Sequence, residues 1–183
     1  WVDLVENQDR RDVELRLVRD DVPIEGRLLN LEGQPLKGIN VRVLQIMTAN
    51  SGSTFGAPSG FFHAATTGGD GRFRLTGVGR DRTALLGIAG PGIERNFVLI
   101  ATGSLPALQQ NGILAYVAKF EHPCKPGKTI SGIVRDIDTG SPIPGITVSN
   151  EFDKDLRSTT DGDGRFQLDG LPKSTKYTLH ASA

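Results

Sequence analysis

The stretch TTDGDGRFQLDGLP at residues 159–172 repeats, with few changes, the earlier stretch TTGGDGRFRLTGVG at residues 66–79. Each copy joins an acidic, glycine-rich turn to a segment in which apolar and polar residues alternate. The segments upstream also match: PIEGRLLNLEGQPLKGINVRV at residues 23–43 answers to TISGIVRDIDTGSPIPGITVS at residues 129–149. Two matching segments in the same order indicate two copies of one structural unit.

The first copy is longer than the second. Pro35 and Pro142 lie 107 positions apart, whereas Gly71 and Gly164 lie 93 positions apart. The first copy therefore holds 14 additional residues (107 − 93) between its matching segments. They fall within IMTANSGSTFGAPSGFFHAA, residues 46–65, which we treat as an insertion loop.

The insertion loop supplies the candidate binding residues, because loops on a rigid scaffold are where recognition concentrates. The candidates for contact with a ligand or partner are Phe55, Phe61, Phe62 and His63. A structural interpretation, which we favour, lets Phe61 and Phe62 begin a strand while Phe55 covers the sheet. The residues alone leave both interpretations open.

Alternating apolar and polar residues predict β-strands in both copies. In GRFRLTG, for example, Phe73 and Leu75 face inward while the arginines between them face water. The expected strands are 12–19, 24–30, 39–47, 63–67, 71–76, 82–89, 94–101, 113–121, 130–136, 145–151, 156–160, 164–168 and 176–182. Helical periodicity is absent, apart from one possible turn at residues 105–112. Short strands separated by Gly and Pro predict an all-β fold with one β-sandwich in each unit.

Composition excludes several classes of partner. The 21 basic and 21 acidic residues of this 183-residue chain cancel, so we expect no nucleic-acid partner. No run of 18 apolar residues occurs, and we expect no membrane insertion. The single cysteine excludes an intrachain disulfide. The chain begins at Trp1 without a basic and apolar leader, which suggests a fragment or a processed form.

The acidic turns are predicted to be structural and not metal sites. A calcium loop of the EF-hand type needs oxygen ligands at positions 1, 3 and 5 and a glutamate at position 12, and these turns lack the glutamate. A phosphate loop would lead into a helix, whereas a strand follows here. We expect Asp70 and Asp163 to bond the turn backbone and Gly71 and Gly164 to adopt positive φ. No metal and no cofactor are expected.

No catalytic constellation is visible in the sequence. The histidines, His63, His122 and His180, are far apart and show no metal-ligand spacing. We expect a solvated imidazole at His122 and an outward one at His180. Cys124 has no assignable base, so an incidental thiol is favoured over a reactive one. We therefore expect no catalytic residues and no enzyme activity.

The second copy resembles the carboxypeptidase regulatory-like domain over residues 130–179, through ISGIVRDIDTGSPIPGITV followed by TDGDGRFQLDGLP. The first copy resembles it at residues 24–43 and 67–78. The resemblance implies a transthyretin-like, Ig-like sandwich of seven strands in each unit. It also implies an accessory module without activity of its own, as found on peptidases, transporters and bacterial surface proteins.

The expected organisation follows from the two copies. Residues 1–10 form an N-terminal segment, 11–104 the first sandwich, 105–112 a linker and 113–183 the second sandwich. Only one strand follows the turn of the second unit, so we expect it to lack its last strand. Residues 1–6, WVDLVE, or a further native strand would then cover the open edge.

Taken together, these features predict a non-catalytic structural or binding module of a larger bacterial protein. The expected partners are other domains of that protein, or a protein or glycan. The resemblance weakly favours an extracytoplasmic or cell-surface location. The alternative is a carbohydrate- or peptide-binding module that uses residues 46–65, although the few, scattered Trp and Tyr rings argue against a sugar-stacking platform. An enzyme is the third and least favoured class.

Overall fold

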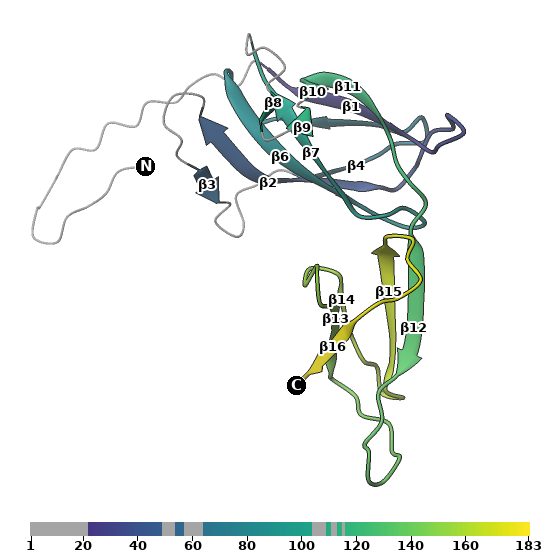
Figure 1. Ribbon diagram of the computed structural model, residues 1–183. Helices are drawn as coiled ribbons and strands as arrows, with labels where there is room; N and C mark the ends of the chain where they lie inside the picture. Colours follow the sequence, from purple (N-terminus) through teal and green to yellow (C-terminus); the bar gives the residue numbers. More distant parts are fainter. Residues whose placement is uncertain (1–21, 49–53, 57–63, 104–108, 111–112, 115) are drawn as a thin grey trace, which may run out of the picture.

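The computed structural model describes residues 22–48, 54–56, 64–103, 109–110, 113–114 and 116–183. These residues form two units of β-strands, and the second unit (β12–β16) lies below one end of the first (Figure 1). They contain strands, turns and bends but no helix, so the all-β fold class predicted from the alternating pattern is confirmed. Across those same ranges, nothing has the length and apolar character of a membrane-spanning helix.

The first unit is a sandwich of two sheets. One sheet has the order β11-β1-β5, and the other has the order β10-β7-β6-β2-β3, with β4 also paired to β2. The strands of this unit are β1 (Ile24–Leu29), β2 (Asn40–Thr48), β3 (Thr54–Gly56), β4 (Ala64–Thr66), β5 (Arg72–Leu75), β6 (Arg82–Ala89), β7 (Asn96–Ala101), β10 (Tyr116–Val117) and β11 (Lys119–Pro123). A short hairpin of β8 (Gln109–Gln110) and β9 (Ile113–Leu114) precedes β10.

The core of the first unit fills the space between these sheets. Ile24 and Leu28 of β1 are fully buried, as are Leu86 and Ile88 of β6 in the facing sheet. Inward residues therefore alternate with outward ones along both strands, as the period-two pattern requires. The inward phenylalanine of β5, Phe73, is 6% exposed.

The second unit has the same plan with fewer strands. β12 (Lys128–Ile133) pairs with β15 (Arg165–Leu171), and β13 (Thr147–Asn150) lies between β14 (Arg157–Thr159) and β16 (Leu179–Ser182). Its fully buried apolar residues are Val148, Leu168 and Leu171, against which half-buried side chains pack. The second core is thus smaller and more open than the first.

The repeat detected in the sequence is also a repeat of hydrogen bonds. The Thr67 hydroxyl donates to the Leu36 carbonyl at 2.6 Å, and it accepts from the amide of Ile39 at 2.9 Å. Thr160 does the same in the second unit, with the Ile143 carbonyl at 2.8 Å and the Ile146 amide at 2.9 Å. Both units therefore tie the turn to the preceding loop by one buried threonine. We name this contact the threonine clamp.

The predicted strands agree closely with the structure wherever it describes the chain. The strand at residues 82–89 has the predicted bounds, and most of the others differ by a few residues at their ends. The single strand predicted at residues 113–121 is instead divided among β9, β10 and β11. The sequence predicted neither β3 nor β8. β8 is a strand at residues 109–110, within the segment 105–112 for which the sequence allowed a helical turn. The strand predicted at residues 12–19 lies outside the described residues, as do residues 1–10 and most of residues 105–112.

Two strands, β10 and β11, belong to a different unit from the one expected. The sequence placed residues 113–121 at the start of the second sandwich, but β10 pairs in parallel with β7, and β11 in parallel with β1. Both strands therefore complete the first unit, which has more than the seven strands expected. The connection to the second unit is residues 124–127, not the linker expected at 105–112. Parallel pairing over this separation leaves no local trace in the sequence.

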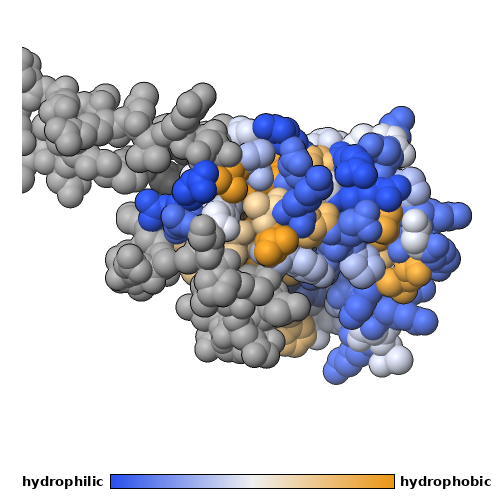
Figure 2. All heavy atoms as spheres, turned by 90° about the horizontal axis from the view of Figure 1, so that it is seen from above, coloured by the Kyte–Doolittle hydropathy of each residue, from blue (hydrophilic) through white to orange (hydrophobic). Residues whose placement is uncertain are grey.

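The outer surface is mostly hydrophilic on the face that Figure 2 shows. In the view from above, hydrophilic side chains predominate, and hydrophobic ones show in small areas between them (Figure 2). The most exposed large apolar side chains of the described residues are Ile137, 96% exposed, and Phe152, 87% exposed. Both lie in loops of the second unit, not on a continuous apolar face.

Candidate functional site

The two acidic turns have the backbone geometry expected of structural turns. Gly71 has φ of 76° and Gly164 has φ of 70°, values that L-residues rarely adopt. A Cβ at Gly71 would also lie 2.5 Å from the carbonyl oxygen of Leu28, and one at Gly164 would lie 2.7 Å from that of Val134. Both glycines are therefore required by conformation and by close backbone approach.

In both turns a carboxylate accepts hydrogen bonds from backbone amides. In the second turn, however, it belongs to a different aspartate from the one that the sequence predicted. In the first turn, the Asp70 carboxylate accepts from the amide of Arg72 at 3.0 Å. In the second turn, the acceptor is Asp161, which bonds the amides of Asp163 at 3.0 Å and Arg165 at 2.8 Å. The role expected of Asp163 thus belongs to Asp161. No group of three or more metal-ligand side chains occurs in the described part of the chain.

The candidate contact residues of the insertion loop lie largely outside the described residues. Phe61, Phe62 and His63 fall there, and their roles stay predictions. Phe55 lies in β3, which pairs antiparallel with the end of β2 so that Phe55 faces Ile46 across the ladder. The segment around Phe55 is therefore attached to a strand of the larger sheet.

His122 is buried in the first unit, and the expectation of a solvated imidazole is wrong. Oδ1 of Asn96 accepts a hydrogen bond from the backbone amide of Phe97 at 2.7 Å. The side-chain amide nitrogen of Asn96 therefore lies toward Nε2 of His122, at 3.0 Å. An amide nitrogen only donates, so Nε2 accepts and the proton sits on Nδ1, which lies 3.1 Å from the Tyr116 hydroxyl. Burial lowers the pKa of His122, which keeps the ring neutral.

Alternation along β11 could have revealed this burial. Phe120, His122 and Cys124 follow one another at every second position, and all three are buried. The neighbouring prolines obscured that pattern. His180, in contrast, is exposed on β16, as the sequence predicted.

Cys124 does not have the environment of a reactive thiol. Its side chain is 2% exposed, and burial raises its pKa to about 11. The thiolate is the reactive form, so a raised pKa suppresses nucleophilic chemistry. The cysteine acts as a small apolar residue of the first core.

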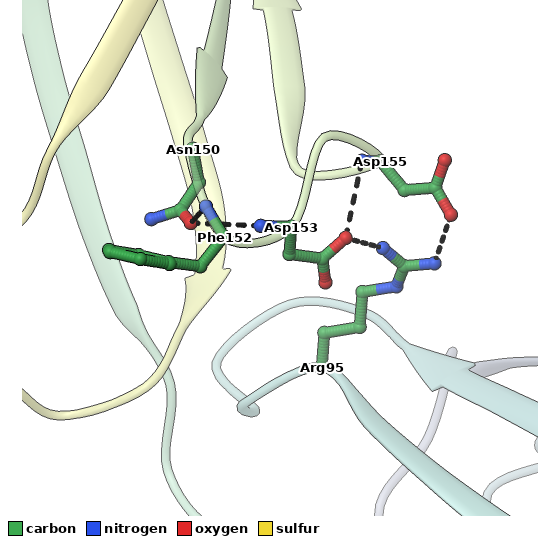
Figure 3. A network of polar contacts seen from close by, with 5 residues as sticks. All are labelled: Arg95, Asn150, Phe152, Asp153 and Asp155. Atoms are coloured by element: carbon green, nitrogen blue, oxygen red, sulfur yellow. Dashed lines mark hydrogen bonds and ion pairs between the residues drawn. The ribbon is translucent and has the colours of Figure 1, made fainter.

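The most developed polar site joins the two units, and no sequence motif pointed to it. Arg95, just before β7, donates from Nη1 to Asp153 at 2.5 Å and from Nη2 to Asp155 at 2.6 Å (Figure 3). Its side chain is only 8% exposed. The hydrogen bond from Arg95, followed by the charge of its guanidinium, lowers the pKa of Asp155. We name Arg95, Asp153 and Asp155 the arginine junction.

Asn150 orients the loop that carries the two carboxylates. Its Oδ1 accepts from the amide of Phe152 at 2.9 Å and from that of Asp153 at 3.1 Å (Figure 3). These bonds form a turn at the end of β13, a geometry that asparagine favours. The turn presents Asp153 and Asp155 to the guanidinium of Arg95.

Backbone contacts reinforce the same junction. The amide of Arg95 donates to the Gly170 carbonyl at 2.9 Å, and the amide of Glu94 donates to the Lys125 carbonyl at 2.9 Å. A Cβ at Gly127 would overlap the backbone of Ile93 and lie 2.8 Å from the amide nitrogen of Glu94. The connecting segment 124–127 is therefore packed against the first unit and not extended into solvent.

Comparison with known proteins supports the family resemblance for the second unit. The family model of the carboxypeptidase regulatory-like domain matches residues 129–183. No curated protein matches the sequence significantly.

Several solved structures are similar in outline. The Bacillus anthracis TIE protein is 17% identical with a TM-score of 0.34, and the alignment covers 89% of this chain but 28% of that one. A mutant of the shaft pilin SpaA from Lactobacillus rhamnosus GG is 16% identical with a TM-score of 0.33, covering 87% of this chain and 85% of that one. The major pilin SpaD from Corynebacterium diphtheriae is 13% identical with a TM-score of 0.41, covering 92% and 56%.

Proposed function

We propose that this chain is a non-catalytic structural module whose two sandwiches, both of carboxypeptidase regulatory-like type, hold a fixed relative orientation. The module belongs to a larger bacterial protein, outside the cytoplasm or on the cell surface, and its partners are the other domains of that protein. The family match over residues 129–183 and the hydrogen bonds shared by the two units support the assignment of both sandwiches to one type.

The arginine junction is the observation that carries this proposal. A guanidinium presents donors in a rigid fork, so bonds from Nη1 and Nη2 to two different carboxylates restrict rotation as well as distance. Hydrogen bonds to charged groups are also stronger than neutral ones, at about 1.5–3 kcal/mol. An accessory module that swung freely on its linker would gain nothing from burying this arginine.

The chemistry of the remaining polar groups supports a module without activity. The one buried imidazole of the described residues, that of His122, bonds Asn96 and Tyr116 through its two ring nitrogens and is shielded from solvent. The thiol of Cys124 is buried with a raised pKa. Neither group is placed to act on a substrate.

Residual dipolar couplings of the full chain test the fixed orientation. In the wild type, both units are expected to report one common alignment tensor. Arg95→Ala is expected to separate the tensors, because the second unit then turns about residues 124–127. The matched control is Arg74→Ala, which removes an exposed 2.8 Å ion pair with Glu25 inside the first unit and should leave the common tensor intact. Independent tensors in the wild type would refute the proposal.

Binding through the insertion loop is the second candidate function. The pairing of β3 with β2 favours it, because the loop then leaves from a strand held in the larger sheet. A variant with Phe55, Phe61 and Phe62 changed to Ser tests it on glycan and peptide arrays. The loop proposal requires binding by the wild type and its loss in the variant. Equal array profiles for the two proteins would refute it.

A further inference from the structure

The imidazole of His122 connects the two sheets of the first unit. His122 lies on β11, in the smaller sheet, and is 8% exposed. Its Nε2 lies 3.0 Å from the side-chain amide nitrogen of Asn96, the first residue of β7 in the larger sheet. Its Nδ1 lies 3.1 Å from the hydroxyl of Tyr116 in β10, which pairs with β7. One ring therefore ties β11 to the larger sheet.

A second proton on this ring is incompatible with the contact to Asn96. The neutral ring accepts at Nε2 from the amide nitrogen of Asn96, whereas an imidazolium donates from both ring nitrogens. Two donors would then face each other. A half-turn of the Asn96 amide does not resolve the conflict, because its Oδ1 accepts from the backbone amide of Phe97 at 2.7 Å. The turned amide would place two donors against each other at Phe97.

The groups around the ring do not supply a negative charge for the imidazolium. Its hydrogen-bond partners in the described structure are the neutral side chains of Asn96 and Tyr116, and the next inward residue of β11 is the thiol Cys124. β7 and β10 contain no charged residue. The charged residues of β1, β5 and β11 alternate with the inward ones: Glu25, Arg27, Arg72, Arg74, Lys119 and Glu121.

Three more charged residues flank these strands in the chain. Glu94 and Arg95 precede β7, and Lys125 follows β11 by two positions. Arg95 is a cation already bound to the two carboxylates of the arginine junction. Burial is the cause that lowers the pKa of His122, so no neighbouring carboxylate offsets the cost of a buried proton.

β10 and β11 would respond to this conflict together. Tyr116 stacks on Phe120 of β11, with ring centroids 5.0 Å apart, and meets the His122 ring edge-on at 5.7 Å. Nδ1 can donate to the Tyr116 hydroxyl in either protonation state. The contact that protonation removes is therefore the one to Asn96. Without it, the two strands are held to β7 by the pairing of Tyr116 and Val117.

We propose that His122 is an acid-sensitive latch that holds β10 and β11 in the first unit, and that a proton at Nε2 opens it. β11 leads directly into β12 (Figure 1). In the closed form the connection between the units is residues 124–127, whereas in the open form it begins at residue 116 and is longer. The arginine junction involves neither β10 nor β11, so the latch is tested separately from the proposed fixed orientation.

Amide hydrogen exchange of the full chain measures the opening of the latch. The amides of Glu25 and Cys124 report on β11, because they donate at 2.7 Å to the carbonyls of Ala118 and Leu29. One proton is taken up below about pH 6.5 when the latch opens. Between about pH 7.5 and 5.5, the protection of both amides should therefore fall about five- to tenfold, after correction for intrinsic exchange. Unchanged protection would overturn the proposal.

Denaturant distinguishes the opening of the latch from unfolding of the whole unit. At about pH 5.5, low urea concentrations should leave exchange at Glu25 and Cys124 unchanged, because opening two short strands exposes little surface. Leu28 is the matched control, since its amide donates to Gly71 on the other side of β1 at 2.9 Å. Its exchange should be about tenfold slower and should accelerate with urea. The same urea dependence at all three amides would overturn the proposal.

Two variants test the chemistry at Nε2. His122→Gln offers an acceptor to Asn96 and does not titrate, so the acid-induced loss of protection should disappear. Asn96→Asp retains the acceptor for the Phe97 amide and places a carboxylate beside Nε2, which stabilises the imidazolium and should also abolish the loss. The amide spectrum at about pH 7.5 verifies that each variant folds. A five- to tenfold loss that persists in either folded variant would overturn the proposal.

Discussion

Both units contain the same turn and the same threonine clamp, yet only the first closes its core. Leu86 and Ile88 of β6 are fully buried, whereas their counterparts on β16 are the half-buried Leu179 and the exposed Ala181. β6 is covered by β7 on its far side, and β16 has no such neighbour among the described strands. The turn is therefore fixed by local hydrogen bonds, while core burial depends on strands that arrive later in the chain.

A second difference lies in the strand that follows the first loop. β2 continues past Val43, which is 2% exposed, as far as Thr48 and into the insertion. β13 ends at Asn150, the counterpart of Val43, whose side chain bonds the following loop. One position thus contributes an apolar side chain to the core in the first unit and shapes the arginine junction in the second.

The largest expected effect tests the difference between the two cores. Phe73→Ala should lower the free energy of unfolding of the first unit by about 3–5 kcal/mol, because it empties a buried aromatic site. Phe166→Ala should cost the second unit less, about 1–3 kcal/mol, because that ring is only half-buried. Native-state hydrogen exchange reads the two units separately. Equal losses would show that the second core is closed.

An intermediate effect is expected in the first unit as the pH falls below the ordinary pKa of histidine. The pKa of His122 is lowered in the folded state, so the unfolded state takes up the proton more readily below the ordinary value of 6.5. The stability that the neutral ring contributes is complete above that pH. It is lost as the pH falls from there toward the folded pKa.

Denaturant unfolding between about pH 4.5 and 8, on either side of the ordinary histidine pKa of about 6.5, measures this dependence. His122→Gln should remove the decline that begins below about 6.5, while His180→Gln, at an exposed position, should leave it unchanged. A decline that survives His122→Gln would contradict the assignment to the buried ring.

The smallest effects are expected at the exposed turns. Asp161→Ala should cost about 1 kcal/mol, because two backbone amides lose their acceptor, and Asp70→Ala about half as much, because one does. Asp163→Ala should stay within about 0.5 kcal/mol of the wild type. Thermal unfolding with and without calcium provides the complementary measurement. A calcium-dependent rise in the melting temperature that Asp161→Ala abolishes would restore the metal interpretation.

Local pattern predicted most strands, because period-two alternation and glycine turns act over a few residues. The strand at residues 82–89 and the positive φ of Gly71 and Gly164 are examples. The sequence placed β11 in the wrong unit, because strand pairing depends on residues that are far apart along the chain. Its alternation marks a strand, but which strand it pairs with depends on the fold of the intervening chain.

The arginine junction could not be predicted from the sequence either, because it also joins residues that are far apart along the chain. Arg95 meets carboxylates 58 and 60 positions away, and no motif encodes such a contact. The side chain of Arg95 is 8% exposed, compared with 31% for Arg27 and 62% for Arg74, and this burial follows from the packing of both units. A pattern of glycines does not specify which aspartate of the turn accepts the backbone amides. The loop geometry gives that role to Asp161 and not to Asp163.

The parallel pairing of β11 with β1 has a mechanical consequence. Tension applied from the second unit pulls on the end of β11, while tension from the opposite side pulls on the start of β1. Because the strands are parallel, these pulls slide them along each other, so the whole ladder from Glu25–Lys119 to Leu29–Pro123 is loaded in shear. Its hydrogen bonds would resist together and not open one at a time from an end.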